Sequence, residues 1–327
     1  MKIRRELIVV FFVVFSSLFA ASCFKDDTEQ KQSDHDIAFD SMKRHFGITE
    51  SDNIGDNIYV HFTDVPDTLT YGSTLADGNG YVIIDYTGIN SNFNVFDVTR
   101  AEDAEENGLY RSDVIYGPIR LKVSQTFLGF YKGIQHVMEG GSAVILIPHD
   151  QAFLDYEPLA YEVTVHRVFE NLDNYNQSQF ESYMDSLGIS SADTLSGVSG
   201  AYYKITTEGD SVPDLDMGDS ITVKIYGYYV EADTAYVDSF PGRQFFPINE
   251  SGDVVTFAFG DIVFPITSIV NYAVEDMKIG ETREVISPAE YGYGTNGFLH
   301  PYVGVYIIPP SMPLHYTLTL VDYQNVN

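Results

Sequence analysis

The stretch SPAEYGYGTNGFLHPYVGVYIIPP, from Ser287 to Pro310, decides what the rest of this 327-residue chain is predicted to be. It follows an apolar segment typical of a strand and is rich in tyrosine, glycine and proline. Proline fixes φ and removes an amide donor, whereas glycine permits left-handed turns. The stretch is therefore predicted to form a flap, an ordered loop that holds aromatic and aliphatic side chains over a cavity.

An internal repeat explains the origin of the flap. FDSMKRHFGI and FESYMDSLGI match at an offset of 141 residues, and YVIIDYTGI matches ITVKIYGYY with Gly88 on Gly227, an offset of 139. EGGSAVILIP also matches IGETREVISP at a similar offset, but PLAYEVTVHRV matches PLHYTLTLVDY at 155. The second copy therefore carries extra residues before its last strand, and this insertion is the flap.

Each copy has the pattern of a short helix followed by several strands. Alternating runs such as YVIIDY, SAVILI, TREVIS and HYTLTLVDY predict strands. One apolar stretch of helical length interrupts each set, at residues 127–138 in the first copy and 265–277 in the second. The sequence thus predicts an α+β fold of two tandem domains, in which one helix covers a face of an antiparallel sheet.

The predicted organisation has five segments. A signal peptide at residues 1–22 precedes a flexible tether at 23–36, because the latter is polar and lacks periodicity. Domain 1 is assigned to residues 37–170, a connector with a helix to 171–196, and domain 2 to 197–327. Domains of about 130 residues have an ordinary core size.

The N-terminus has the pattern of a bacterial lipoprotein signal. Lys2, Arg4 and Arg5 form a basic region, an apolar run covers residues 7–19, and small residues precede Cys23. In such a signal the cysteine is lipidated after cleavage, and Cys23 is the only cysteine in the chain. The alternative is a free thiol. The run is too short for a stable membrane span, so a lipid anchor in the cell envelope is expected.

The residues after Cys23 concern the side of the membrane on which the anchored chain would lie. Lys25, Asp26 and Asp27 resemble the acidic signals that send lipoproteins to the outer surface in some Gram-negative lineages. A solvated tether is the alternative reading. The outer membrane is the expected location, and both readings stand, so the pattern leaves the surface and the periplasmic side open.

The charge balance excludes several classes of partner. The chain has 18 Lys and Arg against 47 Asp and Glu, a formal net charge of −29. A field of this sign repels nucleic acid and anionic lipid surfaces, so neither is expected as a partner. No disulfide is available to a chain with one cysteine, and its stability must come from packed cores.

The order of motifs resembles the FKBP-type peptidyl-prolyl cis-trans isomerases. The family's Tyr-Thr-Gly is matched by residues 86–88, its Phe-Asp pair by residues 96–97, and its Gly-Trp-x-x-Gly helix start approximately by residues 129–133. In the second copy, residues 288–294 resemble the segment Pro-x-x-x-Ala/Gly-Tyr-Gly, and Ile-Ile-Pro-Pro is unaltered at 307–310. The last two motifs together are specific.

This resemblance covers about residues 56–168 and 200–323. It implies that each domain is a bent antiparallel sheet wrapped on one helix, with an aromatic pocket between them. It also implies peptidyl-prolyl isomerase activity on proline-containing polypeptides, with no cofactor.

The resemblance assigns roles to residues of the second copy. Tyr293 would donate a hydrogen bond to the substrate carbonyl, Asp238 would be a polar wall residue, and the Thr267 N–H would be a main-chain donor. The lining would comprise Ile266, Thr267, Val270, Ile307, Ile308 and Tyr316. Val270 stands where the family has tryptophan, and Val237 replaces the phenylalanine of Phe-Asp, so aromatic walls are expected to be lost.

The first copy differs from the family in the opposite way: it keeps the aromatic residues and lacks the flap. Its degenerate pocket would comprise Tyr86, Phe96, Asp97, Phe130, Phe153 and Tyr161. Phe153 occupies the place of the flap tyrosine and lacks its hydroxyl group, and the flap insertion is absent. The alternative reading is that these aromatic residues are ordinary core, and that Asp97 and Asp238 brace turns.

The chemistry of prolyl isomerisation decides which groups matter. Its barrier of about 18–20 kcal/mol reflects lost amide resonance, so no nucleophile, metal or proton transfer is needed. A dry apolar pocket with donors that favour the twisted amide suffices. No metal is expected, because the eight histidines are scattered. Two functions follow: an envelope prolyl isomerase or folding helper with domain 2 active, or an inactive FKBP-like module that binds peptides or proteins.

Overall fold

The computed structural model describes residues 24–65, 80–153, 157–191, 193–233, 243–247, 253–299 and 306–326. Several sequence predictions lie outside these ranges: the signal peptide with Cys23, residues 300–305 of the flap, and the pair Val237 and Asp238.

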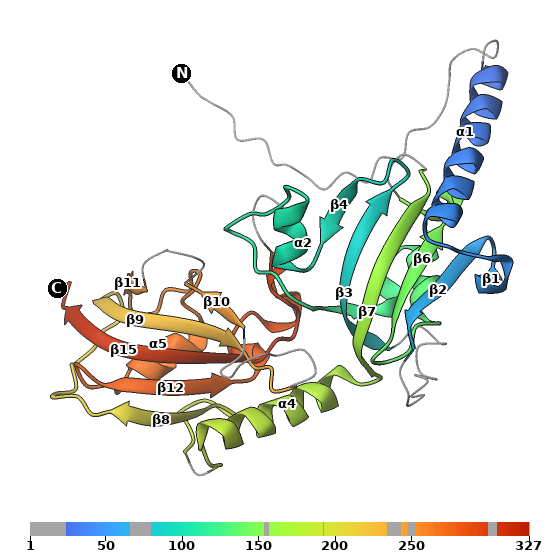
Figure 1. Ribbon diagram of the computed structural model, residues 1–327. Coiled ribbons are helices and arrows are strands. Elements are labelled where there is room, and N and C mark those ends of the chain that lie inside the picture. Colours follow the sequence, from blue (N-terminus) through green and yellow to red (C-terminus); the bar gives the residue numbers. More distant parts are fainter. Residues whose placement is uncertain are drawn as a thin grey trace, which may run out of the picture.

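Two antiparallel sheets are joined by helix α4, Leu172–Leu187 (Figure 1). The first contains β1 (Asn53–Gly55), β2 (Ile58–Asp64), β3 (Tyr81–Asn90), β4 (Val95–Val98), β5 (Ile119–Lys122), β6 (Ser142–Ile147) and β7 (Leu159–Phe169). The second contains β8 (Tyr202–Thr207), β9 (Ser220–Tyr229), β10 (Gln244–Phe246), β11 (Val254–Ala258), β12 (Thr282–Ser287) and β15 (Leu314–Gln324).

The two sheets have the same topology. The first runs β2-β6-β7-β3, and both β4 and β5 pair with β3 on the side away from β7. The second runs β8-β12-β15-β9, with β10 and β11 on the corresponding side of β9. The predicted fold class, two tandem α+β domains built on antiparallel sheets, is confirmed.

One short helix packs on each sheet, α3 (Leu128–Ile134) in the first domain and α5 (Ser268–Val274) in the second. Helix α3 approaches strand β6 closely, because a Cβ atom at Gly129 or Gly133 would overlap an isoleucine of that strand. Both helices are shorter than predicted. After α3 the chain continues in i→i+3 turns, as in the bond from the Val137 N–H to the Ile134 carbonyl at 3.1 Å, while Val137 stays buried.

A longer helix precedes each sheet: α1 (Phe24–His45) and α4. The prediction of a flexible tether at residues 23–36 differs from the structure, in which the chain is helical from Phe24 onward. This segment is rich in Lys, Glu, Gln and Asp, and straight-chain polar residues lose little rotamer freedom in a helix. Basic side chains in the last turn complement the helix dipole. No helix in the described part of the chain is apolar and long enough to span a membrane.

The remaining short elements are connections. They are η1 (Glu50–Asp52), α2 (Ala101–Glu106), η3 (Val123–Gln125) and η4 (His149–Gln151) in domain 1, and η5 (Ala289–Tyr291), η6 (Gly294–Asn296), β13 (Phe298–Leu299) and β14 (Tyr306–Ile308) in domain 2. The last four lie between β12 and β15 and form the flap. The equivalent connection of domain 1, between β6 and β7, is much shorter, as the repeat offset predicted.

A buried polar chain fixes helix α4 to the second sheet. His315 of β15 is 1% exposed, and its Nδ1 atom lies 3.1 Å from the Tyr183 hydroxyl of α4. Its Nε2 atom lies 2.5 Å from Oε2 of Glu284 on β12, which also accepts a hydrogen bond from Thr317 at 2.8 Å. Burial alone would raise the pKa of Glu284, but the hydrogen bond and charge of His315 and the Thr317 hydroxyl outweigh it and lower this pKa.

We expect Glu284→Gln to reduce the free energy of unfolding by about 1–3 kcal/mol at pH 7. Since the pKa of Glu284 is lower in the folded state, its contribution is present above the unfolded-state pKa and is lost as pH falls through the folded-state pKa. The gap between wild type and variant in urea denaturation should therefore narrow below about pH 4. A gap that stays constant from pH 7 to 3 contradicts the prediction. Glu208→Gln, at an exposed ion pair, is the matched control and should change stability little.

Candidate functional site

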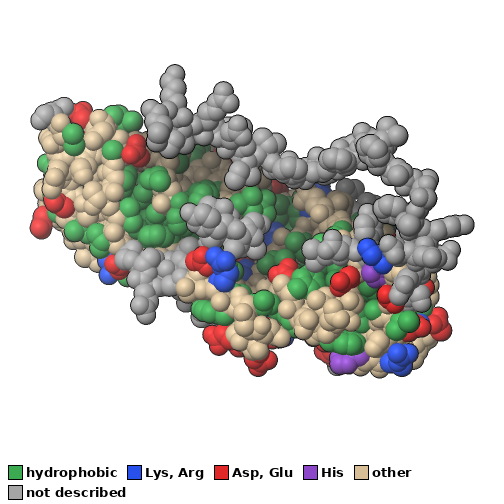
Figure 2. All heavy atoms as spheres, turned by 90° about the horizontal axis from the view of Figure 1, so that it is seen from above, with side chains coloured by type: hydrophobic (Ala, Val, Ile, Leu, Met, Phe, Trp, Pro, Cys, Tyr) green, Lys and Arg blue, Asp and Glu red, His purple; other side chains and the backbone are tan. Residues whose placement is uncertain are grey.

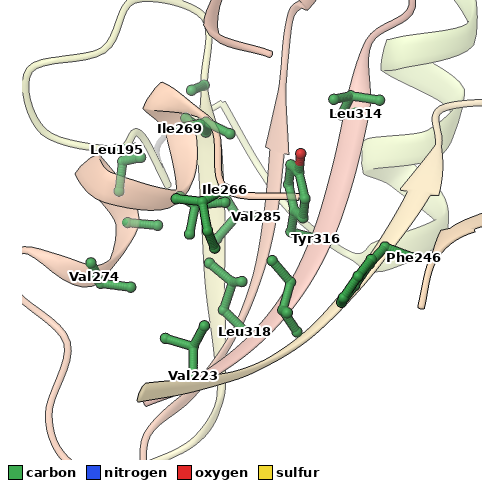
Figure 3. Close-up of a cluster of buried hydrophobic side chains, with 14 of the residues drawn as sticks. Leu195, Val223, Phe246, Ile266, Ile269, Val274, Val285, Leu314, Tyr316 and Leu318 are labelled. Atoms are coloured by element: carbon green, nitrogen blue, oxygen red, sulfur yellow. The ribbon is translucent and has the colours of Figure 1, made fainter. Parts of the chain in front are cut away.

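The predicted lining residues of domain 2 lie together in one buried cluster. Ile266, Val270, Ile307, Ile308 and Tyr316 are each less than a tenth exposed. Figure 3 shows Ile266 at the start of α5 next to the ring of Tyr316, which projects from β15. The structure therefore brings these residues to the place between helix and sheet where the pocket was predicted.

Thr267 connects the helix to the wall of this pocket. It is the N-terminal cap of α5 and is fully buried, and its hydroxyl lies 3.4 Å from that of Tyr316. The Tyr316 hydroxyl also donates to the Pro265 carbonyl at 3.4 Å. Among the described residues the Thr267 N–H has no hydrogen-bond partner. It can therefore serve as a main-chain donor to a ligand.

Tyr293 places an unpaired hydroxyl group at the pocket. It packs against the core cluster, but its hydroxyl is buried and lacks a hydrogen-bond partner within the part of the chain that the structure describes. Burial raises the pKa of Tyr293, so the group remains a protonated donor at neutral pH. A buried unpaired donor is costly, and such a group is explained when a ligand completes its hydrogen bond.

Aromatic rings surround Tyr293. Phe298 lies 5.3 Å from it and Phe264 6.2 Å, measured between ring centroids, and these two phenylalanines stack at 4.9 Å. Phe246 meets Phe264 edge-on at 5.8 Å. The second domain thus retains an aromatic surround, supplied by residues that the motif comparison did not identify.

Exposed apolar side chains adjoin these rings in sequence. Ile262 and Val263 precede Phe264, Leu299 follows Phe298, and Tyr306 begins β14; their exposed fractions are 67%, 56%, 49% and 44%. Figure 2 shows hydrophobic side chains gathered on one face of the molecule. Such a surface favours contact with apolar segments of another chain.

Strand register identifies the counterpart of the Phe-Asp pair in domain 2. In domain 1, Asp97 of β4 is opposite Gly88, and the neighbouring Phe96 ring covers that glycine. In domain 2, the residue opposite Gly227 is Phe246 of β10.

Phe245, which precedes Phe246, has the role of Phe96. A Cβ atom at Gly227 would lie 2.6 Å from Cε2 of the Phe245 ring. This ring meets Tyr316 edge-on at 5.6 Å, as Phe96 meets Tyr161 at 6.0 Å. In the strand register, Phe246 therefore takes the position that Asp97 has in domain 1, while Asp238 lies outside the described residues and its predicted role stays a prediction.

This strand register changes the expected character of the pocket. The position of the polar wall residue is occupied by Phe246, which is 8% exposed, and Asp238 lies outside the described residues. The aromatic wall that was expected to be lost with Val237 is supplied by Phe245. The adjacent phenylalanines of QFF, together with the proline that follows, were the available sequence signal.

A further contact holds the flap over the pocket. The ring of Tyr229 stacks on Phe245 at 5.7 Å, and its hydroxyl donates to the carbonyl of Ile307 in β14. Within the flap, β14 pairs with β13, with Ile308 opposite Phe298. The flap is thus fixed both to itself and to the sheet.

The six predicted residues of domain 1 also lie together. Tyr161 is within 5.1–6.0 Å of Phe130, Tyr86 and Phe96, and Phe153 contacts Phe96 at 6.4 Å between ring centroids. Phe130 and Tyr161 are buried, whereas Phe153 is 41% exposed. Phe127, which was not assigned to the pocket, packs between Phe153 and Tyr161. The rings fill the space between α3 and the sheet.

The polar pair of domain 1 keeps its geometry. The Tyr86 hydroxyl donates to Oδ2 of Asp97 at 2.6 Å. Desolvation raises the pKa of Asp97 above its usual value, although the hydrogen bonds from Tyr86 and from the Val98 N–H act in the opposite direction. Asp97 is nevertheless exposed, so it lies in a concave site that solvent can enter.

Comparisons with known proteins agree with this geometry. Residues 215–321 match the family model described as FKBP-type peptidyl-prolyl cis-trans isomerase. That range contains the pocket of domain 2 and supports isomerase activity there. No curated protein sequence matches the chain.

Several solved structures are similar to parts of the chain. The three FKBP domains of wheat FKBP73 are 14% identical over 82% of this chain and 94% of that one, with a TM-score of 0.30. FkpA from Escherichia coli is 18% identical over 47% and 62%, with a TM-score of 0.35. A peptidyl-prolyl cis-trans isomerase from Pseudomonas syringae pv. tomato is 16% identical over 46% and 92%, with a TM-score of 0.33.

We expect Gly227→Ala to reduce the free energy of unfolding by about 1–3 kcal/mol, because its methyl group would overlap the fully buried Phe245 ring. Gly88→Ala is the matched variant, and it should cost less because Phe96 is only partly buried and its ring can shift. Hydrogen exchange measured by mass spectrometry should show lost protection in β9 and β10 for the first variant. Equal losses in both variants contradict the prediction.

Proposed function

We propose that the second domain, which belongs to the FKBP-type peptidyl-prolyl cis-trans isomerase family over residues 215–321, accelerates cis-trans exchange of prolyl bonds in polypeptides. The observation that carries this proposal is the buried Tyr293 hydroxyl, which has no partner among the described residues and is surrounded by aromatic rings.

The pocket offers what the isomerisation needs. In this proposal the proline ring packs against the apolar cluster that contains Ile266 and Tyr316, next to the flap. There the Tyr293 hydroxyl and the Thr267 N–H are available to the substrate carbonyls. Donors in a dry site stabilise the twisted amide more than the planar one, because the twisted amide has lost its resonance and localises charge.

The position of Phe246 sets a limit on this mechanism. With phenylalanine opposite Gly227, no carboxylate of the described residues stands at that position of the wall. Catalysis in domain 2 then depends on apolar exclusion of water and on neutral donors, and the rate should vary little with pH near neutrality. In domain 1 the carboxylate is present but no tyrosine corresponds to Tyr293.

Tyr293→Phe is expected to lower kcat/KM for a prolyl tetrapeptide at least about tenfold, the loss of roughly 1.4 kcal/mol of transition-state stabilisation. Stability should be unchanged or slightly increased, since the removed hydroxyl is an unpaired buried group. A protease-coupled assay and urea denaturation measure the two effects. Tyr291→Phe, in the same flap, is the control and should retain activity.

The alternative function gives a different result in the same assay. If the wild-type protein does not accelerate exchange over the uncatalysed rate, the isomerase proposal fails, and domain 2 is a binding module. If Tyr293→Phe retains full activity, the assignment of the donor is wrong even though the activity stands.

The proposed setting is the bacterial cell envelope, with the chain attached to the outer membrane through a lipid on Cys23 and acting on exported proteins. The support is the lipoprotein pattern of the first 23 residues. A prolyl isomerase needs no cofactor, which suits a compartment without nucleotides.

Cys23→Ser is expected to move the full-length protein from the detergent phase to the aqueous phase in a partition experiment, because the acyl chains supply the membrane affinity. Mass spectrometry of the N-terminal peptide should show the diacylglyceryl group in the wild type alone. An unmodified Cys23 in the wild type contradicts the anchor. Protease treatment of intact cells would then report the surface or periplasmic side.

A further inference from the structure

A cavity of about 380 Å³ lies where the two domains meet. Domain 1 contributes the Tyr86–Asp97 pair, the loop of residues 114–118 and strand β5, and domain 2 contributes Tyr306 together with the flap prolines 309–310. The cavity therefore joins the polar pair of one domain to the flap of the other.

Specific contacts hold the two walls in place. Ile115 of the domain 1 loop packs against the core cluster of domain 2, and Gly117 approaches Arg243 so closely that a Cβ atom would lie 2.5 Å from the guanidinium. Arg167 of β7 pairs with Asp233, with Nη2 2.8 Å from Oδ1. The cavity is thus part of a packed interface between the domains.

Helix α4 adds a bridge on the same side. The Asn176 side chain accepts a hydrogen bond from Arg120 of β5 at 2.9 Å and donates one to the Ser311 carbonyl beside the flap at 2.8 Å. One side chain thereby sets the distance between β5 and the flap.

The charge of the cavity is opposite to that of the protein. Among the described residues, Arg120, Lys122 and Arg243 line it against one carboxylate, Asp97, although the whole chain has only 18 Lys and Arg. Arg243 is neutralised by the buried Glu231 at 2.8 Å. Within the described chain Lys122 forms no salt bridge, and its ammonium group lies 6.0 Å from the centre of the Tyr81 ring. In a chain of net charge −29, this is a local site for an anionic group.

One wall of the cavity is the edge of a sheet. Strand β5 pairs with β3 on one side, and none of the described strands pairs with its other side. An edge strand presents main-chain donors and acceptors that an extended segment can pair with. Pro118, Ile119 and Leu121 add apolar surface along the same wall.

We propose that this cleft between the domains binds an extended polypeptide segment that carries apolar residues and an acidic side chain, with the acidic group at Lys122 and Arg120. The proposal rests on the proposed function and deepens it, because it gives domain 1 the role of holding a client chain whose prolyl bond enters domain 2. Apolar side chains of the client contact Ile115 and Tyr306, and its backbone follows β5.

The test uses the full chain and two fluorescein-labelled ten-residue peptides without proline, one of alternating Val and Glu and one of alternating Val and Lys. Fluorescence anisotropy should show tighter binding of the Glu peptide to the wild type, although the net charge of the protein favours the Lys peptide. Lys122→Glu should weaken the binding of the Glu peptide about tenfold or more. Lys31→Glu, on the exposed side of α1, makes the same change in net charge and should leave its affinity unchanged.

The outcomes separate this proposal from the isomerase proposal. Tetrapeptide isomerase activity should be the same in Lys122→Glu and the wild type, since Lys122 lies outside the pocket of domain 2. A wild type that binds the Glu peptide but does not isomerise the tetrapeptide supports the cleft and overturns the isomerase proposal alone. The cleft proposal is overturned if the Lys peptide binds more tightly, or if Lys122→Glu binds the Glu peptide as the wild type does. It is also overturned if sedimentation shows a wild-type dimer that Lys122→Glu dissociates.

Discussion

The covering of a strand glycine by one phenylalanine ring is the contact on which both domains depend. In domain 2, Phe245 lies on Gly227 and contacts both Tyr316 and Tyr229, so the wall of the pocket and the anchor of the flap meet at one fully buried ring. Any Cβ atom at the glycine would displace that ring, and the displacement would pass to the flap through the Tyr229 bond to Ile307. The same arrangement in domain 1, with Phe96 on Gly88, indicates that this contact belongs to the fold rather than to either site.

The two domains have divided the features of a prolyl site between them. Domain 2 has the flap, the unpaired tyrosine hydroxyl and a main-chain donor, but phenylalanine in place of the acidic wall. Domain 1 keeps the tyrosine–aspartate pair at 2.6 Å, but its aromatic rings pack against one another, and Phe153 in place of the flap tyrosine has no hydroxyl group. An apolar wall suits a mechanism that relies on exclusion of water. An accessible carboxylate with a raised pKa, next to a cationic strand, suits binding rather than turnover.

The sequence predicted the repeat, the α+β class and the flap insertion, because hydrophobic period and motif order are local and survive changes in loop length. It did not predict that Phe246 pairs opposite Gly227, since β9 and β10 are joined by a longer connection than β3 and β4, and an ungapped offset does not follow the strand register. The strand register is set by backbone pairing and by the phenylalanine ring that packs on the glycine. Residue spacing in the sequence encodes neither. The N-terminal part of helix α1 was missed for another reason: residues 24–36 favour a helix individually but show no apolar stripe, whereas the part from Phe39 onward was predicted.

The contacts between domains were beyond sequence reasoning, and they have the largest consequence for how the molecule acts. Ile115, Asn176 and Arg167 lie in a loop, a helix start and a strand end, and each makes its contact with residues more than sixty positions away. A flexible connection would leave the domains as independent modules. Here helix α4 is instead hydrogen-bonded to the second sheet through Tyr183 and His315 and to β5 through Asn176, and charged pairs span the junction. A client chain bound at β5 therefore has a high effective concentration at the flap, and modest affinity at each site suffices for residence at both.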